Sequence, residues 1–397
     1  MKKNAKKYMK IRKLKIKNYK MFEDIEFDFT DKNGKTLDTV IFAGINGTGK
    51  TSLLEFIMKI FTDINHYAYE DIDKVELELY KNERNLIVES QYYSDNDIKK
   101  YMIFKGNERK YMDNEIYSIT EILSDKNNFK ISYFHNNVFS DKKKFFQNSD
   151  VFFKYIDYEN FEKDLQKYFD DVIYKYILKN RNLTANQVIE KRIKEINNFL
   201  KELKITTKIV DIEDNKLILE NISGKKLEIK DLSDGEKQIY FRAIFFNTLN
   251  LENSLIFVDE PELSLHPQWQ SLAVNFYQNA GNDNQVFLAT HSPHIIGKVP
   301  PESVFLLKYE NNKIIVENAK YTKGHSISYI LSEIMETNYK DTFINETVNK
   351  LLKLIRKGKH KTEEGKKLLK EINELSPESE ERIKVNFSMK RYEAIGR

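Results

Sequence analysis

The first thirty residues alternate between apolar and polar side chains. A period of two predicts one or two strands with a single buried face. Residues 39–43 form a short apolar run followed by a glycine, which indicates a buried strand. Residues 50–62 then place apolar side chains on one face of a predicted helix. The alternating apolar positions are Ile11, Leu14, Ile16, Phe22, Ile25, Phe27 and Phe29.

The middle of the chain has a different pattern. Residues 74–105 predict further strands. Residues 138–205 carry runs of Phe, Tyr, Lys, Asp and Glu without Pro or Gly, and this composition predicts a helical insertion. Alternation returns over residues 206–230 and predicts a hairpin around Asp214–Asn215.

The second half returns to buried strands and ends in helices. Residues 254–258 and 285–289 are apolar runs, residues 303–318 predict two more strands, and residues 325–376 are helical in pattern until Pro377. This order predicts an α/β fold, with a mixed sheet, flanking helices, a helical insertion and a C-terminal helical region. The predicted divisions are residues 1–135 and 206–324 for two parts of one core, 136–205 for the insertion and 325–397 for the C-terminal region.

Composition excludes several classes of protein. The chain has 397 residues, with 40% apolar and 32% charged residues, which favours a globular protein over disorder. It has no cysteine, which excludes a disulfide framework, thiol catalysis and cysteine-based zinc sites. No run of 18 apolar residues and no secretory signal pattern is found, so we expect a cytoplasmic protein without membrane contact.

One motif has a specific chemical meaning. The run Gly44-Ile45-Asn46-Gly47-Thr48-Gly49-Lys50-Thr51 matches the phosphate loop (Walker A) pattern, between a predicted strand and a predicted helix. Its glycines let backbone N–H groups converge on phosphate oxygens. Lys50 is expected to reach the β- and γ-phosphates of ATP, and Thr51 to bind Mg²⁺. The predicted nucleotide-binding residues here are Asn46, Gly47, Thr48, Gly49, Lys50, Thr51 and Ser52.

Two carboxylates follow a buried strand further along the chain. Asp259 stands where P-loop enzymes hold the Mg²⁺ shell (Walker B), and Glu260 is the predicted general base for the attacking water. Glu262 is the next candidate for that base. Surface acids at a strand end would give the same pattern, but the phosphate loop upstream favours the catalytic interpretation.

The segment Leu232–Gln238 resembles the signature of ABC ATPases, with Asp234 in place of the first glycine of the usual pair. The resemblance implies that Ser233, Gly235 and Glu236 face the nucleotide of a second subunit, and therefore a homodimer or a higher even-numbered oligomer. Leu263–Pro267 resembles the D-loop of that family, and His291 resembles its switch histidine, which contacts the γ-phosphate. His266 and His294 are expected to be structural.

The family's Q-loop glutamine has no clear counterpart. Ile131–Phe134 reads as a strand, but His135, Asn136 and Asn137 follow it, and Gln91 is an alternative. The order of motifs is most similar to the SMC/RecF/OLD branch of ABC ATPases. Within that branch the chain resembles PtuA-like ATPases of Septu and retron anti-phage systems, on the segments ELSLHP, ATHSP and GHSISYIL.

This resemblance implies an ATPase that switches a separate effector nuclease of HNH type. The chain itself has no recognisable nuclease site, so we expect any nuclease activity to come from another polypeptide. Residues 325–397 are predicted to dock that partner or, alternatively, to cover the core. A RecF-like DNA-repair ATPase is the alternative function, and a transporter subunit ranks last because the motifs lie far apart. Residues 1–20 carry ten Lys or Arg and no acid, which suits either nucleic-acid binding or a solvated tail.

Overall fold

The chain forms two compact units, residues 1–330 and 331–397, which are described separately. The computed structural model describes residues 9–62, 74–81, 84–91, 100–105, 108–111, 130–134, 152–156, 174, 177–178, 182–213, 216–249, 251–335 and 342–395.

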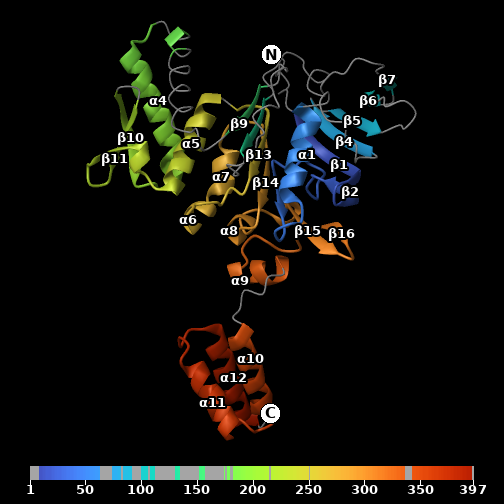
Figure 1. The fold of residues 1–397 in the computed structure, drawn as a ribbon, viewed down its shortest axis with the longest axis vertical. Coiled ribbons are helices and arrows are strands. Elements are labelled where there is room, and N and C mark those ends of the chain that lie inside the picture. Colours follow the sequence, from blue (N-terminus) through green and yellow to red (C-terminus); the bar gives the residue numbers. More distant parts are fainter. Residues whose placement is uncertain are drawn as a thin grey trace. The chain divides into compact units, whose positions relative to one another are not determined.

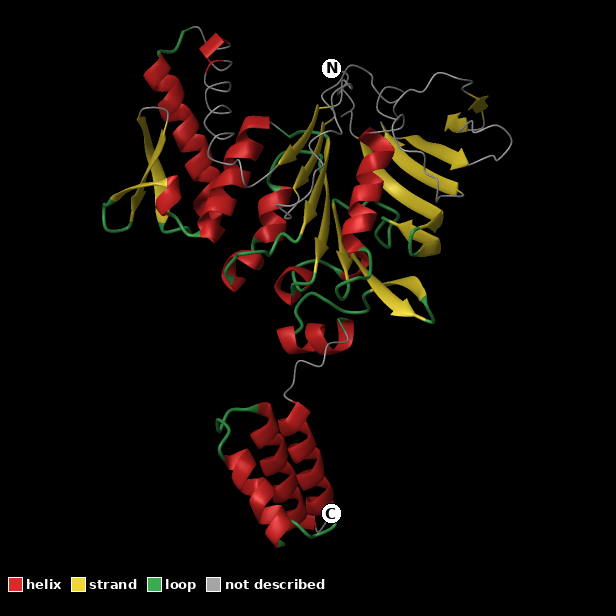
Figure 2. Ribbon diagram, in the orientation of Figure 1, coloured by secondary structure: helices red, strands yellow, loops and turns green. Residues whose placement is uncertain are grey.

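A seven-stranded sheet forms the centre of the first unit (Figures 1 and 2). All pairings are parallel except that of β15 with β16, so the α/β prediction is confirmed. The three central strands have no exposed residue, which explains their continuous apolar runs. In sheet order the strands are β16 (Lys313–Asn318), β15 (Val304–Glu310), β3 (Thr39–Ala43), β14 (Gln285–Thr290), β13 (Ser254–Asp259), β8 (Lys130–Phe134) and β9 (Phe152–Ile156).

A second, antiparallel sheet is built from the alternating segment and the strands that follow it. The apolar face of β1 packs with helix α1 (Lys50–Thr62) and with the central sheet in one continuous core. Helix α1 therefore lies between the two sheets (Figure 1). In sheet order the strands are β2 (Phe22–Asp28), β1 (Met9–Tyr19), β4 (Lys74–Lys81), β5 (Arg84–Gln91), β6 (Lys100–Lys105) and β7 (Glu108–Tyr111).

Two lysines of β1 lie opposite acids on both neighbouring strands. Lys13 is paired with Asp28 and Glu78 in the ladder, and Lys15 with Glu26 and Glu76. The ammonium of Lys13 lies 3.2 Å from Asp28, and this contact raises the pKa of Lys13. Cross-strand carboxylates thus neutralise Lys13 and Lys15. For this strand, they favour a solvated basic face over nucleic-acid binding. Residues 1–8 lie outside the described residues.

A lobe of helices and short strands joins the core on its other side. Helix α4 packs on α5 and β10, and the predicted hairpin is confirmed as β10 and β11, although Asp214 and Asn215 lie outside the described residues. The lobe consists of α4 (Ala185–Leu200), β10 (Thr207–Glu213), β11 (Lys216–Asn221), β12 (Lys226–Glu228) and α5 (Asp234–Leu249). The helices α6 (Pro267–Gln270), α7 (Ala273–Gln278), α8 (Pro293–Ile296) and α9 (Ile327–Tyr329) lie outside the lobe.

The predicted helical insertion needs a correction. Residues 136–205 contain helix α4, which begins with a Thr184–Gln187 capping box. They also contain β9, which extends the central sheet by parallel pairing with β8. A five-residue segment rich in Phe and Tyr fits either a short strand or part of a helix by its sequence alone. Only the pairing with β8 decides between them.

The second unit is a bundle of α10 (Thr342–Arg356), α11 (Glu363–Asn373) and α12 (Glu380–Ile395). Leu351, Leu352 and Ile355 pack with side chains of α11 and α12 in a separate core. These three residues therefore serve packing inside the bundle and do not form a docking face. No helix in the described part of the chain is long and apolar enough to cross a membrane.

Candidate nucleotide site

The phosphate loop joins the end of β3 to the start of α1. Gly47 and Gly49 have φ angles of 87° and 86°, a region that favours glycine. A Cβ atom at Gly49 would lie 2.7 Å from Phe22 and from Met21, so only glycine fits there. The loop is closed by Thr48, whose hydroxyl donates to the carbonyl of Ile45 at 2.9 Å.

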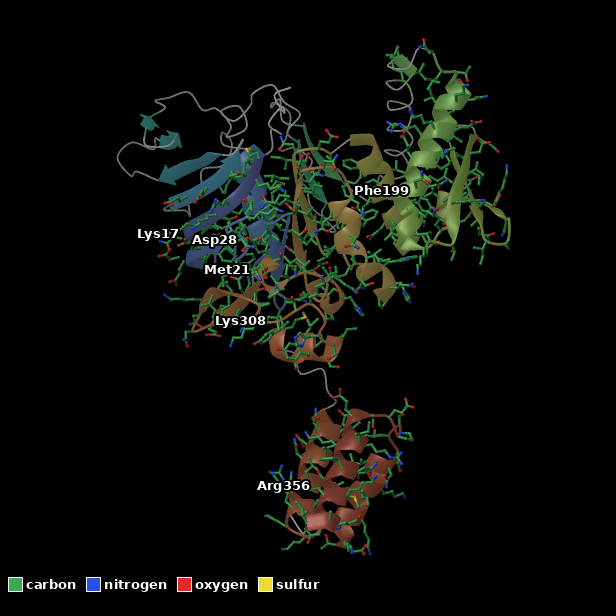
Figure 3. All side chains as sticks on the ribbon, turned by 180° about the vertical axis from the view of Figure 1, so that it is seen from behind. Lys17, Met21, Asp28, Phe199, Lys308 and Arg356 are labelled. Carbon is green, nitrogen blue, oxygen red and sulfur yellow. The ribbon has the colours of Figure 1, made fainter. Side chains whose placement is uncertain are left out.

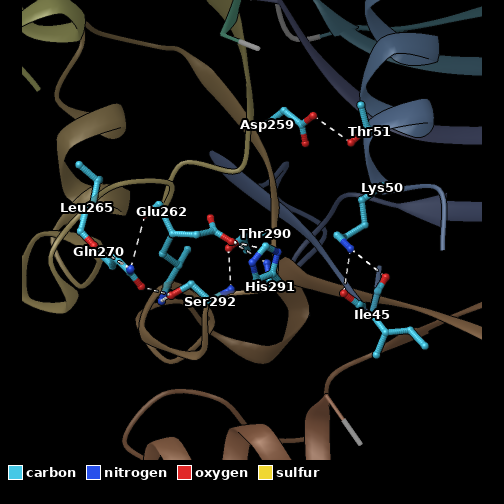
Figure 4. Close-up of polar contacts among 12 residues, drawn as sticks. Ile45, Lys50, Thr51, Asp259, Glu262, Leu265, Gln270, Thr290, His291 and Ser292 are labelled. Atoms are coloured by element: carbon cyan, nitrogen blue, oxygen red, sulfur yellow. Dashed lines mark hydrogen bonds and ion pairs between the residues drawn. The ribbon is translucent and has the colours of Figure 1, made fainter. Parts of the chain in front are cut away.

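Lys50 is buried within this loop. Its ammonium donates to the carbonyl oxygens of Gly44 at 2.8 Å and Ile45 at 2.9 Å (Figure 4). Burial lowers the pKa of Lys50, while the nearby carboxylates of Asp259, Glu260 and Glu262 act in the opposite direction. Among the described residues the hydrogen-bond partners of Lys50 are neutral carbonyls, so the ammonium is suited to receive an anionic ligand.

The sheet brings Thr51 and Asp259 together from positions far apart in the sequence. The Thr51 hydroxyl donates to Asp259 Oδ2 at 2.8 Å (Figure 4). Their oxygen atoms are the kind of ligand that Mg²⁺ prefers, and neighbouring oxygens in its octahedral shell lie about 3 Å apart. These two side chains therefore fit a site in which Mg²⁺ is held by one hydroxyl, one carboxylate and substrate phosphates.

Glu260 adopts an unusual backbone conformation directly after β13. Its φ angle is 46°, in the left-handed region that costs a non-glycine residue about 1 kcal/mol or more. Two hydrogen bonds hold it there: its N–H donates to Ala289 O at 2.9 Å, and its carbonyl accepts from Leu263 N at 3.1 Å. Strain of this kind is characteristic of functional sites, where it aims a side chain away from the strand direction.

The predicted switch histidine is held by Glu262. The backbone N–H of His291 donates to Glu262 Oε1 at 2.9 Å, and His291 Nδ1 lies 3.5 Å from the same oxygen. Glu262 is buried, and its second oxygen has no hydrogen-bond partner among the described residues. The imidazole itself is 44% exposed, so its backbone is fixed while its ring is open to a ligand.

Further contacts link the D-loop segment to the histidine. The Ser292 hydroxyl donates to Gln270 Oε1 at 2.8 Å, and Gln270 Nε2 donates to Leu265 O at 3.0 Å (Figure 4). His266 caps helix α6 by accepting from Gln268 N, as expected for a structural histidine. Gln270 was not predicted from the sequence, because a glutamine in a short helix outside any motif gives no signal of its own.

The signature segment forms the start of α5. Ser233 and Glu236 make a reciprocal cap: the Ser233 hydroxyl and N–H both donate to Glu236 Oε2, at 2.8 and 3.2 Å, and Glu236 N–H donates back to the hydroxyl at 3.4 Å. The carboxylate of Glu236 is thus used to orient Ser233.

Gly235 and the substituted Asp234 lie in different surroundings. A Cβ atom at Gly235 would lie 2.5 Å from the carbonyl oxygen of Ser264, in the D-loop segment, so no larger residue fits. The side chain of Asp234 is 77% exposed. The packing between the signature and the D-loop therefore requires glycine at position 235, the second of the family's glycine pair. At position 234, the first of the pair, an exposed aspartate is accommodated.

The structure does not select a Q-loop residue. Strand β8 ends at Phe134, and His135, Asn136 and Asn137 lie outside the described residues. Gln91 ends β5 in the antiparallel sheet, beside Lys74 and Lys100 in the ladder.

Comparison with known families agrees with this arrangement. Residues 40–297, more than half of the chain, match the family described as "AAA domain, putative AbiEii toxin, Type IV TA system". The chain belongs to this family. The predictions of an ATPase and of a nucleotide-binding P-loop core are thereby confirmed.

Two relatives match along most of the chain. The "Retron Vc95 probable ATPase" of Vibrio cholerae serotype O1 biovar El Tor is 24% identical, with 92% of this chain and 87% of that protein covered. The "Retron Ec83 probable ATPase" of Escherichia coli is 23% identical, with 91% and 82% covered. The predicted similarity to retron ATPases is confirmed.

Among solved structures, the "SMC head domain from Thermotoga maritima" is similar, with 14% identity and a TM-score of 0.49. The match covers 78% of this chain and 99% of that chain.

Proposed function

We propose that this ATPase works as a two-fold symmetric dimer that encloses two ATP molecules, and that its closure controls a separate effector nuclease in anti-phage defence. One observation carries the dimer. Helix α5, which begins at the signature, lies on the other side of β13 and β14 from α1 and the phosphate loop (Figure 1). In its own chain the start of α5 packs on the D-loop, through Gly235 and Ser264.

The Ser233 hydroxyl is held by Glu236 at the start of α5, and a helix start with a serine hydroxyl can receive a phosphate that its own phosphate loop does not present. In a dimer with a two-fold axis, the nucleotide bound to each subunit supplies this phosphate to Ser233 of the other subunit. Each composite site then contains the phosphate loop of one subunit and the signature of the other. This arrangement makes ATP itself part of the interface.

The chemistry assigned to each side chain follows from its position. Lys50 exchanges its two carbonyl partners for phosphate oxygens, and Thr51 and Asp259 hold Mg²⁺, which when bound neutralises charge on the β- and γ-phosphates. Glu260 orients the attacking water and accepts its proton. His291, anchored through Glu262, faces the γ-phosphate.

The nuclease part of the proposal rests on the retron relatives and on the division of the chain into two units. The second unit carries no nucleotide motif, so it is available as a docking platform for the effector. Closure of the ATPase dimer would then change the geometry between two docked effectors.

The test uses Glu260→Gln, which removes the base but keeps the size of the side chain. We expect ATP binding to remain and turnover to fall at least about a hundredfold, with accumulation of an ATP-bound dimer in light scattering. Turnover within a few fold of wild type would move the base elsewhere. A mutant that binds ATP but stays monomeric would contradict the enclosed-dimer proposal.

A further inference from the structure

One stretch of the bundle concentrates positive charge without any acid. Residues 347–362 contain six Lys or Arg and no Asp or Glu. All six side chains are exposed, and Arg356 is visible on the bundle in Figure 3. They are Lys350, Lys353, Arg356, Lys357, Lys359 and Lys361, and together they are called the α10 basic surface.

These cations are not neutralised by neighbouring carboxylates. None of the six forms an ion pair within the described part of the chain. Helix α11 differs, because Lys366 lies 3.1 Å from Glu363. Strand β1 differs too, since Lys13 and Lys15 pair with acids across the sheet.

The periodicity of α10 aligns part of this charge in one row. Its apolar residues face the bundle core, through Val348 and Leu351 among others, so its polar face is turned outward. Lys350 and Lys353 lie three residues apart on that outer face. Lys357 follows the end of the helix and continues the row, because its N–H still donates to Lys353 O at 3.3 Å. The row is about 10 Å long at 1.5 Å per residue, which spans neighbouring phosphates of one nucleic-acid strand.

Helix stability explains only part of the pattern. Cations in a last helical turn interact favourably with the macrodipole, which accounts for Lys353 and Arg356. Lys350 lies a turn earlier, and Lys359 and Lys361 lie beyond the helix in the connection to α11. Helix stability therefore does not account for the whole set.

We propose that the α10 basic surface binds the phosphate backbone of nucleic acid without reading its sequence. Ammonium groups act as point charges toward phosphates, and this stretch has no exposed aromatic side chain for base stacking. A lipid surface is disfavoured, because the apolar side chains within residues 347–362 are buried or half-buried and leave no exposed one to insert. This surface is independent of the nucleotide chemistry.

The experiment compares two triple variants of the full-length chain. Lys350→Gln/Lys353→Gln/Lys357→Gln removes three charges from the row. The matched control, Lys366→Gln/Lys367→Gln/Lys370→Gln, removes the same charge from α11, where acids are interspersed. Binding of a labelled 20-base-pair DNA duplex is followed by fluorescence anisotropy at several salt concentrations, and thermal unfolding checks that both variants are folded.

We expect the α10 variant to bind at least about tenfold more weakly at 50 mM salt, with a salt slope smaller by roughly two to three. The control should keep both values close to wild type. Equal losses of affinity in the two variants would show that net charge alone controls binding, and this would overturn the proposal. A wild-type chain that does not bind the duplex would overturn it as well. Binding that survives the α10 changes but is lost on deleting residues 1–8 would also overturn it. So would capture of the wild type, but not the α10 variant, by phosphatidylserine vesicles without duplex binding.

Discussion

Lys50 is the single residue whose surroundings are most specific for an anion. Its charge is buried, and the only hydrogen bonds it makes among the described residues are to carbonyls of its own loop. We expect Lys50→Ala to remove most ATP affinity, a loss of at least about tenfold, because it deletes the charge that faces the phosphates. Equilibrium binding of a labelled ATP analogue measures this. Unchanged affinity in a folded variant would disprove the phosphate-loop assignment.

The lowered pKa of Lys50 gives this prediction a pH signature. Because burial favours the neutral amine, Lys50 in the free protein loses its proton at a lower pH than an exposed lysine does. The folded state therefore binds fewer protons than the unfolded chain in that window, so this group's contribution to stability rises with pH there. ATP affinity should move oppositely and decline across the same window, and the Lys50→Ala variant should lack this decline.

Glu262 is a positioning residue in our proposal. Its carboxylate accepts from the N–H of His291 and lies beside Nδ1. We expect Glu262→Ala to lower kcat at least about tenfold while ATP binding stays within a few fold, because His291 loses its anchor. Glu262→Gln, which keeps an acceptor oxygen, should recover part of the activity. A loss in Glu262→Gln as large as in Glu260→Gln would instead identify Glu262 as the base.

The sequence identified most residues of the candidate site but not the contacts between them. Lys50, Thr51, Asp259 and His291 stand in motifs that local pattern reveals. The contact of Glu262 with His291 depends on the parallel pairing of β13 with β14, which carries the two residues to the same sheet edge. Such pairing is a tertiary property, so spacing along the chain does not disclose it.

At the scale of elements, buried and alternating strands were predictable because each has a periodicity of its own. Strand β9 was not predictable, because it has only five residues within a charged segment. It becomes a strand by parallel pairing with β8. Helix α5 illustrates a further limit. The substitution at Asp234 looked like a departure from the family, yet its side chain is exposed, and the close contact falls on Gly235.

The location of α5 supports a prediction about shared sites. Lys50→Ala and Ser233→Arg should each inactivate a homodimer, the first through its own loop and the second through the partner's nucleotide. A heterodimer has one site with both lesions and one with neither. An equal mixture should therefore recover about a quarter of wild-type hydrolysis, if the sites act independently and subunits pair at random.

Differently tagged subunits, purified in sequence, verify that heterodimers form. If they form and hydrolysis stays absent, either the sites are not shared or both must act together. Titration with wild-type subunits separates these cases, because obligatory joint action predicts inhibition of wild type by either variant.

At the scale of the whole molecule, the chain divides into an ATPase unit and a bundle with its own core. The sequence predicted that residues 325–397 dock a partner, but Leu351, Leu352 and Ile355 of α10 pack inside the bundle. Helix α12 provides a different surface. Val385 is buried in the bundle core, whereas Ile383 and Phe387, one helical turn apart, are 54% and 69% exposed.

Deleting residues 342–397 tests whether the bundle serves the ATPase or its output. Because the bundle has a separate core, we expect the truncated chain to stay folded and to hydrolyse ATP within about twofold of wild type, while it no longer co-purifies with a nuclease encoded beside it. Phe387→Ser in the full-length chain should weaken that association without lowering the thermal stability of the chain, since this side chain contributes little to the core. A truncation that is insoluble or unable to bind ATP would show that the bundle completes the ATPase fold. Retention of the nuclease by the truncated chain would place the docking surface on the first unit, and the switch would then act through the ATPase core directly.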